Sequence, residues 1–151
     1  MGVYKKYKIA GGRQMLYLET LKRQHEEIAE IVSDIKSYIN HKDIAKEALE
    51  LSSKISNLAG KLKVHLNTED QYMYPQLLKS SNSEVRTTAQ AYIDEMGTIS
   101  TQFMAYKDRF NTRTKITKDI DTFVSESHRI FDLLEQRIAK EDANLYTYQE
   151  I

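Results

Sequence analysis

The sequence predicts an all-α protein, an up-down-up-down four-helix bundle with left-handed packing. Apolar side chains recur in steps of three and four residues over most of the chain, which is the period of helices that pack lengthwise. The 151 residues include one proline and five glycines, so little interrupts regular structure. Short polar breaks separate four periodic segments, and short connections between long helices make neighbours antiparallel.

The composition restricts the class of protein. Lysine plus arginine and aspartate plus glutamate number 22 each, so the formal net charge is zero and nothing global favours nucleic acid or an anionic membrane as a partner. The absence of cysteine excludes disulfides, thiolate metal sites and cysteine nucleophiles. No apolar run approaches the roughly 20 residues that a membrane span needs. We therefore expect a cytoplasmic protein.

We expect one folded domain. Residues 1–12 form a short basic lead with tyrosines, which ends at Gly11-Gly12, a natural break before a helix. This lead lacks the apolar segment that follows the basic residues of a secretory signal. The helical bundle then occupies residues 13–151.

The first two helices carry one continuous inward stripe each. The stripe of the first helix, which we expect to begin at Arg13, is Leu18, Leu21, His25, Ile28, Val32, Ile35 and Ile39. Asp43 is placed to cap the second helix, which we expect to run to about Leu77 or Leu78, with Pro75 loosening its last turn. The stripe of the second helix is Ile44, Ala48, Leu51, Ile55, Leu58, Leu62, His65, Glu69 and Tyr72.

The third and fourth helices follow the same rule. Ser81, with Glu84 three residues later, has the form of a capping box for the third helix. The stripe of the third helix is Val85, Ala89, Tyr92, Met96, Ile99, Phe103, Tyr106 and Phe110. After a turn at 111–114 we expect the fourth helix to be continuous from Ile116. Its stripe is Ile116, Ile120, Phe123, Ser127, Ile130, Leu134, Arg137, Glu141 and Asn144.

Polar side chains interrupt these stripes at one level of the bundle. His65 and Glu69 lie one turn apart on the second helix, and a buried carboxylate is costly unless a cation or a hydrogen-bond donor meets it. We estimated the level of each facing residue from its distance to the connecting turns, at a rise of about 1.5 Å per residue. The expected meeting point in the core consists of His25, His65, Glu69, Met96, Arg137 and Glu141.

The second pair of helices repeats the first. The segment His65–Tyr74, HLNTEDQYMY, aligns with Arg137–Tyr146, RIAKEDANLY. His25 precedes the first segment by 40 residues, and Met96 precedes the second by 41, so Met96 is the counterpart of His25. The sequence therefore predicts a two-fold site with unequal halves. We expect Met96 to serve as core filler, because methionine packs readily into gaps.

This arrangement resembles the hemerythrin-like, cation-binding HHE domain family over roughly residues 13–150. The resemblance rests on His25 in the first helix, on His65-x3-Glu69 followed by Tyr74-Pro75 in the second, and on the repeat in the third and fourth. Members of this family are four-helix bundles that hold a non-haem di-iron centre, with two bridging carboxylates and histidines from all four helices. Family functions include reversible oxygen binding, oxygen or iron sensing, and handling of nitric oxide or peroxide.

The resemblance implies a reduced metal site in this chain. The implied metal ligands are His25, His65, Glu69 and Glu141. Met96 and Arg137 stand where the second iron would have its histidines, so a complete di-iron centre is not expected. We expect one iron or zinc ion, since nitrogen and oxygen donors allow both, with a small diatomic molecule as ligand where the ion is iron.

A second interpretation needs no metal. Arginine stays protonated and its planar fork suits carboxylates, so Arg137 could bridge Glu69 and Glu141 as a covalently attached cation in a structural or protein-interaction module. A third interpretation is an oxidase acting on oxygen or peroxide, although we expect a binding or sensing domain and no enzyme. Among the tyrosines, Tyr72 is expected to donate to the site. His128 lies beside a stripe position and is not expected to be a ligand.

Overall fold

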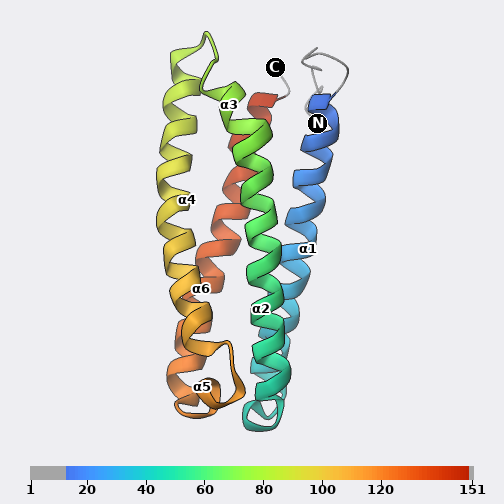
Figure 1. Ribbon diagram of the computed structural model, residues 1–151, viewed down its shortest axis with the longest axis vertical. Helices are drawn as coiled ribbons and strands as arrows, with labels where there is room; N and C mark the ends of the chain where they lie inside the picture. The colour runs from blue at the N-terminus through green and yellow to red at the C-terminus, as the bar shows by residue number, and fades with distance from the viewer. Residues whose placement is uncertain (1–12, 150–151) are drawn as a thin grey trace.

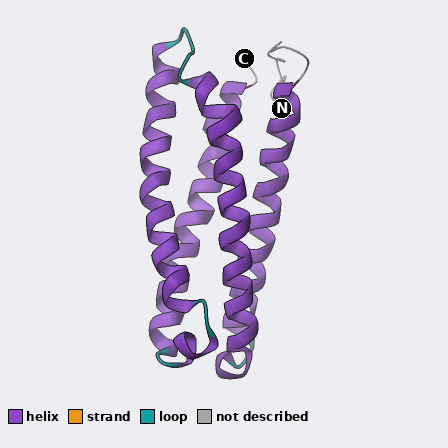
Figure 2. Cartoon of the chain, in the orientation of Figure 1, coloured by secondary structure: helices purple, strands orange, loops and turns teal. Residues whose placement is uncertain are grey.

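Four long helices lie lengthwise beside one another in the computed structural model, which describes residues 13–149 (Figure 1). They are α1 (Arg13–His41), α2 (Ile44–Thr68), α4 (Ser83–Phe110) and α6 (Ile120–Lys140). The ribbon runs down α1, up α2, down α4 and up α6, so the described chain begins and finishes at the same end. The described residues contain no strand (Figure 2). The expected all-α bundle is confirmed, whereas its left-handed packing stays a prediction.

The four helices enclose one interior. Residues of α1 contact α2 and α6, and residues of α4 contact the same two helices. The expected lead of residues 1–12 lies outside the described residues, so the expected division of the chain stays a prediction.

Side-chain caps mark where α2 and α4 begin. Asp43 accepts hydrogen bonds from the first backbone N–H groups of α2, which confirms the expected cap. The expected capping box at Ser81 is wrong. Asn82 caps α4 instead, and its side chain accepts the Glu84 N–H at 2.9 Å. The helix begins one residue later than a Ser81 cap requires, and asparagine is among the strongest capping residues.

The expected continuous fourth helix is also wrong. Lys118 and Asp119 divide it into the short α5 (Arg113–Thr117) and the long α6. Asp119 accepts the Thr122 N–H at 3.1 Å and the Thr122 hydroxyl at 2.6 Å, which starts a new helix. Ile116 is fully buried at the end of α5, so the apolar period continues across the break and does not reveal it.

Buried apolar side chains form two clusters along the bundle. The larger, which we call the long core, includes Ile28, Val32, Ile35, Leu51, Ile55, Leu58, Met96, Phe103, Phe123, Ile130 and Leu134. The smaller, which we call the end cluster, consists of Tyr17, Leu18, Leu21, Met73, Tyr74, Leu77, Val85, Ala89, Tyr92, Leu145 and Tyr146. Buried polar residues lie between these two clusters on α1, at the end of α2 and at the end of α6.

Two π-helical turns lie at this polar level. The turn η2 (Glu69–Met73) joins α2 to the short α3 (Tyr74–Leu77), and η3 (Glu141–Leu145) joins α6 to the 3-10 turn η4 (Tyr146–Gln149). A π turn holds an additional residue, so the residues that follow lie about 100° behind the positions that a continuous α-helix would give them. The second helix does extend to Leu77, as expected, but a π turn divides it into α2 and α3.

This change in side-chain direction decides which tyrosines face the interior. Tyr72 and Asn144 were expected on the inward stripes, but Tyr72 is 53% exposed and Asn144 is also exposed. Tyr74 and Tyr146 are buried in their place, at 4% and 1% exposure. The prediction that Tyr72 donates to the site is therefore wrong, because the stripe was extended without the additional residue.

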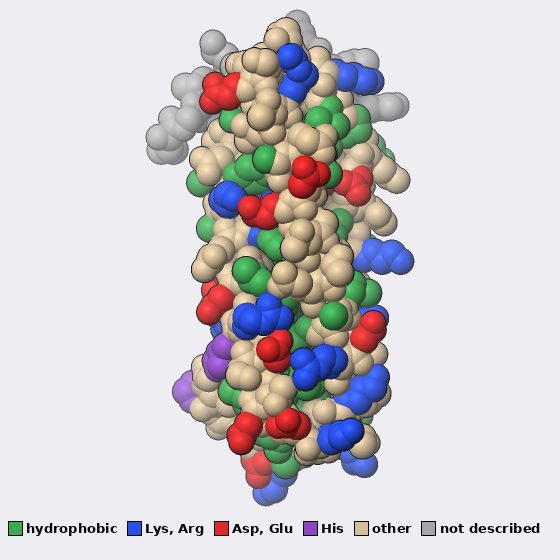
Figure 3. Space-filling view, turned by 90° about the vertical axis from the view of Figure 1, so that its left-hand side faces the viewer, with side chains coloured by type: hydrophobic (Ala, Val, Ile, Leu, Met, Phe, Trp, Pro, Cys, Tyr) green, Lys and Arg blue, Asp and Glu red, His purple; other side chains and the backbone are tan. Residues whose placement is uncertain are grey.

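Charged side chains of both signs are interspersed on the face drawn in Figure 3. Ion pairs link neighbouring helices at the surface, as where Lys54 on α2 meets Asp34 on α1 at 2.6 Å. Across the described part of the chain, no helix combines the length and apolar character needed to cross a membrane.

Candidate metal centre

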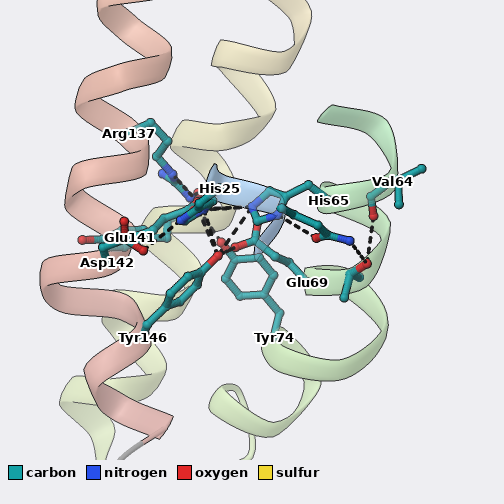
Figure 4. A network of polar contacts seen from close by, with 12 residues as sticks. His25, Val64, His65, Glu69, Tyr74, Arg137, Glu141, Asp142 and Tyr146 are labelled. Atoms are coloured by element: carbon teal, nitrogen blue, oxygen red, sulfur yellow. Dashed lines mark hydrogen bonds and ion pairs between the residues drawn. The ribbon is translucent and has the colours of Figure 1, made fainter. Parts of the chain in front are cut away.

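A cluster of buried polar side chains lies between the long core and the end cluster (Figure 4). Its members, each at most 3% exposed, are His25 on α1, His65 on α2, Glu69 in η2, Arg137 on α6, Glu141 in η3 and Tyr146 in η4. Burying polar and charged groups is costly unless each finds a partner. The partners of each atom therefore define what this cluster can bind.

The structure brings together five of the six residues that the sequence placed at this level. His25, His65, Glu69, Arg137 and Glu141 form the polar cluster. Met96, the sixth, is 6% exposed and packs in the long core, where it was expected as filler. His128, which was not expected to be a ligand, is exposed.

The imidazole of His25 is held at both nitrogens. Its Nδ1 lies 2.8 Å from Asp142 Oδ1 and donates to that carboxylate. Its Nε2 faces the centre, 2.8 Å from Glu141 Oε1 and 3.1 Å from His65 Nε2. Burial acts to lower the pKa of His25, but the hydrogen bonds to Asp142 and Glu141 outweigh burial and raise the pKa to about 9 without a metal ion.

His65 is oriented in the same way by a neutral partner. Its Nδ1 donates to Gln24 Oε1 at 2.9 Å, so its Nε2 also faces the centre. The Gln24 amide donates in turn to the Thr68 hydroxyl at 3.2 Å, and Thr68 donates to the Val64 carbonyl at 2.9 Å. Because the Gln24 nitrogen is held by Thr68, the amide oxygen is the atom that faces His65. Burial lowers the pKa of His65.

Glu141 divides its carboxylate between the histidine pair and Arg137. Oε1 lies 2.8 Å and 3.4 Å from the Nε2 atoms of His25 and His65, while Oε2 accepts the Arg137 Nε–H at 2.7 Å. Burial would raise the pKa of Glu141. The hydrogen bond from His25 and the charge of Arg137 outweigh burial and hold this pKa far below its usual range.

Glu69 is less well satisfied. Its Oε2 accepts the Tyr146 hydroxyl at 3.1 Å, but its Oε1 has no hydrogen-bond partner among the described residues and lies 3.5 Å from His65 Nε2. Burial, followed by the negative charge of Glu141, raises the pKa of Glu69 well above its usual range. A buried carboxylate oxygen without a partner is costly, so this atom requires either a proton or a cation.

The spacing of these atoms matches that of ligands around one ion. Donor atoms about 2.1 Å from a common ion lie about 3.0 Å apart in an octahedron and about 3.4 Å apart in a tetrahedron. The distances among the inward atoms of His25, His65 and Glu141 are 2.8, 3.1 and 3.4 Å, and Glu69 Oε1 lies 3.5 Å from His65 Nε2. His25, His65 and Glu141 offer ligand atoms that all lie within 4.8 Å of one another. One ion therefore fits the three donors of His25, His65 and Glu141, with Glu69 Oε1 beside them.

The second half of the repeat holds a guanidinium where the first half has His65. Arg137 donates through Nε to Glu141, through Nη1 to Glu95 at 3.2 Å, and through Nη2 to the Tyr74 hydroxyl at 3.2 Å and the Tyr92 carbonyl at 2.9 Å. Every nitrogen of this fixed cation has an acceptor. A second metal ion does not fit beside it, because that ion would share the Glu141 oxygen with a guanidinium and would lack nitrogen ligands.

The expected bridge from Arg137 to both stripe carboxylates is corrected by these contacts. Arg137 joins Glu141 to Glu95, while Glu69 pairs with Tyr146. Glu95 was missed because it lies beside the stripe of its helix. It is partly exposed and also accepts Lys140 Nζ at 3.0 Å.

Sequence reasoning also missed the residues that orient the histidines. Gln24 and Asp142 each adjoin a stripe residue, so the period placed both off the inward face. The repeat contained a signal for Asp142, because Glu-Asp occurs in both aligned segments. The same alignment pairs Tyr74 with Tyr146, the two phenols that point into the cluster.

The orientation of the two imidazoles prepares the centre of the cluster for a cation. Both histidines donate through Nδ1, so their Nε2 atoms present lone pairs to each other at 3.1 Å unless a proton or an ion lies between them. Metal-binding imidazoles are commonly oriented through the other ring nitrogen by a carboxylate or carbonyl oxygen, as Asp142 and Gln24 do here.

Comparison with known proteins gives one result. A family model described as the hemerythrin HHE cation binding domain matches residues 16–148, which include most of α1 and all of the polar cluster. No curated protein and no solved structure matches the chain.

Proposed function

The chain belongs to the hemerythrin HHE cation-binding domain family, and we propose that it binds one metal ion where other members would hold two. The proposed ligands are His25, His65, Glu69 and Glu141. The observation that carries the proposal is the pair of anchored imidazoles, whose Nε2 atoms meet 3.1 Å apart beside Glu141. The partnerless Glu69 Oε1 supports it, since a cation would satisfy that atom.

We further propose that the ion is iron and that the domain binds or senses a small diatomic molecule. Two imidazoles and two carboxylates suit iron or zinc alike, and the resemblance to non-haem iron proteins favours iron. When bound, iron would supply a site for a diatomic ligand and one-electron chemistry. The chain itself supplies ligands, a fixed positive charge at Arg137, and apolar clusters that exclude water on both sides.

Metal analysis tests this proposal directly. Protein expressed in iron-supplemented medium should contain about one iron per chain, and His65→Ala should abolish it. His128→Ala is the matched control, because this histidine is exposed and should leave the iron content unchanged. Wild-type protein without stoichiometric metal, together with an unchanged His65→Ala variant, would contradict the proposal.

A metal-free bundle serving as a structural or protein-interaction module is the second candidate function. The observation in its favour is that Arg137 already neutralises Glu141 and that each of its three nitrogens donates to an acceptor within the chain. A protein of this kind should keep the same melting temperature with and without a strong chelator. A chelator-sensitive melting temperature would reject it.

A further inference from the structure

We propose that Tyr146 is a further ligand of the metal ion, with its phenolic oxygen joining the donor atoms of the two histidines and two glutamates. This inference rests on the proposed function, because it requires an ion at that place. Tyr146 enters the cluster from η4, immediately after the π turn that contains Glu141. Its side chain is fully buried, and Figure 4 shows the hydroxyl pointing into the centre of the polar network.

The position of the hydroxyl is that of a ligand atom. The Tyr146 oxygen lies 3.0 Å from His25 Nε2, 3.1 Å from Glu69 Oε2, 3.4 Å from Glu141 Oε1 and 3.5 Å from His65 Nε2. One atom is thus near an atom of each of the four proposed ligands. These separations fall near the spacing of about 3.0 to 3.4 Å expected for donors that share one ion.

Hydrogen bonding alone does not account for all four contacts. A phenol has one proton to donate, and Glu69 Oε2 is placed to accept it. His25 can donate to the phenol when its Nε2 is protonated. In the other two contacts, the lone pairs of the Tyr146 oxygen then face those of His65 Nε2 and Glu141 Oε1. A shared cation would make every one of these contacts favourable.

The internal repeat supplies an independent argument. Tyr74 occupies the position in η2–α3 that Tyr146 occupies in η3–η4, and each tyrosine reaches across to the other helix pair. The Tyr74 hydroxyl accepts a hydrogen bond from Arg137, the residue aligned with His65. In the half with a built-in cation, the phenolic oxygen therefore faces that cation. By the same relation, the Tyr146 oxygen faces the place of the cation in the histidine half.

A phenolate ligand makes the site suitable for ferric iron. On binding, the phenolic O–H bond breaks, an O–iron bond forms, and the proton leaves for solvent by way of Glu69, which already accepts it. The ferric ion and Arg137 then supply four positive charges. The phenolate and the carboxylates of Glu69, Glu141 and Asp142 supply four negative charges. The charge of Glu95, which also contacts Arg137, is balanced by Lys140. The cluster is formally neutral, as a buried site requires.

Spectroscopy of the full chain loaded with ferric citrate tests the proposal. Wild-type protein should show a visible phenolate-to-iron charge-transfer band, and resonance Raman excitation in this band should enhance tyrosine ring vibrations that shift with ring-deuterated tyrosine. Tyr146→Phe should lose the band. Tyr106→Phe is the matched control and should keep it, because Tyr106 is a buried tyrosine of the long core that contacts Ser127.

A second readout is independent of colour. Zinc affinity measured by competition with a chromophoric chelator should fall at least about tenfold in Tyr146→Phe and stay unchanged in Tyr106→Phe. The melting temperature of each variant shows that it is folded. If Tyr146→Phe does not fold, the Raman measurement on wild-type protein decides alone.

The outcomes separate this inference from the proposed function. Stoichiometric iron without a tyrosine charge-transfer band would overturn the ligand role of Tyr146 and leave metal binding intact, with the phenol acting as a hydrogen-bond donor to Glu69. Absence of bound iron and zinc would overturn both. Iron with a band that survives in Tyr146→Phe would overturn the assignment to this residue.

Discussion

At the scale of single residues, Glu141 determines how the two halves of the cluster depend on each other. One of its oxygens faces His25 and His65, and the other accepts from Arg137. Removing the guanidinium leaves a buried carboxylate without its charged partner. Breaking a buried ion pair from one side typically costs about 3–5 kcal/mol.

Arg137→Met should therefore lower the free energy of unfolding by about 3–5 kcal/mol, measured by urea denaturation. Arg129→Met is the control, since Arg129 forms an exposed pair with Glu126 and should change stability by about 0.5 kcal/mol or less. Equal effects of the two substitutions would show that the buried network does not stabilise the fold.

His25 gives the protein without metal a defined pH dependence. Its pKa is raised from an ordinary value of 6.5 to about 9, so the folded state binds a proton that the unfolded state releases. The resulting stability is fully present below pH 6.5 and is lost as the pH rises towards 9. The raised pKa of Glu69 acts in the same direction. The lowered pKa of His65 acts only below 6.5.

Urea denaturation with a chelator present should therefore give a smaller free energy of unfolding at pH 9 than at pH 6.5. Asp142→Asn should reduce this difference, because it removes the carboxylate that holds the His25 proton. A free energy of unfolding that is constant or rises over this interval would contradict the assignment.

Gln24 provides a test of how the histidines are oriented. Gln24→Leu removes the acceptor of the His65 Nδ1–H, so the imidazole is no longer held in the orientation that directs Nε2 to the centre. Loss of such an orienting partner typically lowers metal affinity by about 10- to 100-fold. Zinc competition should show this loss in Gln24→Leu and not in Gln90→Leu, where the glutamine is exposed on α4.

At the scale of elements, the π turns mark the limit of reading a helix from its period. The steps of three and four residues correctly placed His65, Glu69, Arg137 and Glu141 inside. The same steps gave the wrong inward residues immediately afterwards, because each π turn inserts a residue and the apolar pattern contains no sign of it. The aligned tyrosines of the repeat were the available signal, and Tyr72 was chosen by extending a period that had already ended.

The start of α4 tests a second correction at this scale. Asn82→Ala should lower the free energy of unfolding by about 1 kcal/mol, because it removes the side chain that accepts the Glu84 N–H. Ser81→Ala should have an effect within about 0.5 kcal/mol, since the residue is exposed and precedes the cap. A larger effect of Ser81→Ala than of Asn82→Ala would show that Ser81 is the cap, as the sequence predicted.

At the scale of the whole molecule, the sequence predicted the level of the site because bundle geometry is simple. Short turns and a fixed rise per residue are sufficient to bring His25, His65, Glu69, Arg137 and Glu141 together. The hydrogen-bond partners could not be obtained in this way. Gln24 and Asp142 lie off the inward stripes and reach the imidazoles sideways, which depends on how each pair of helices packs.

Metal binding should stabilise the molecule as a whole. An ion that binds only the folded state, at a concentration 100 times its dissociation constant, adds about 2.7 kcal/mol to the free energy of unfolding. The melting temperature should therefore rise with added metal in wild-type protein and stay constant in His65→Ala. A parallel rise in both would indicate binding elsewhere.

The position of the site between two apolar clusters has a consequence for exchange with solvent. The long core closes one side along the bundle axis and the end cluster closes the other, with both π turns at the boundary. An ion or gas molecule must then enter laterally, between helices that have to separate. Release of metal to an excess of chelator should thus be limited by bundle opening, at a rate independent of chelator concentration and accelerated by denaturant.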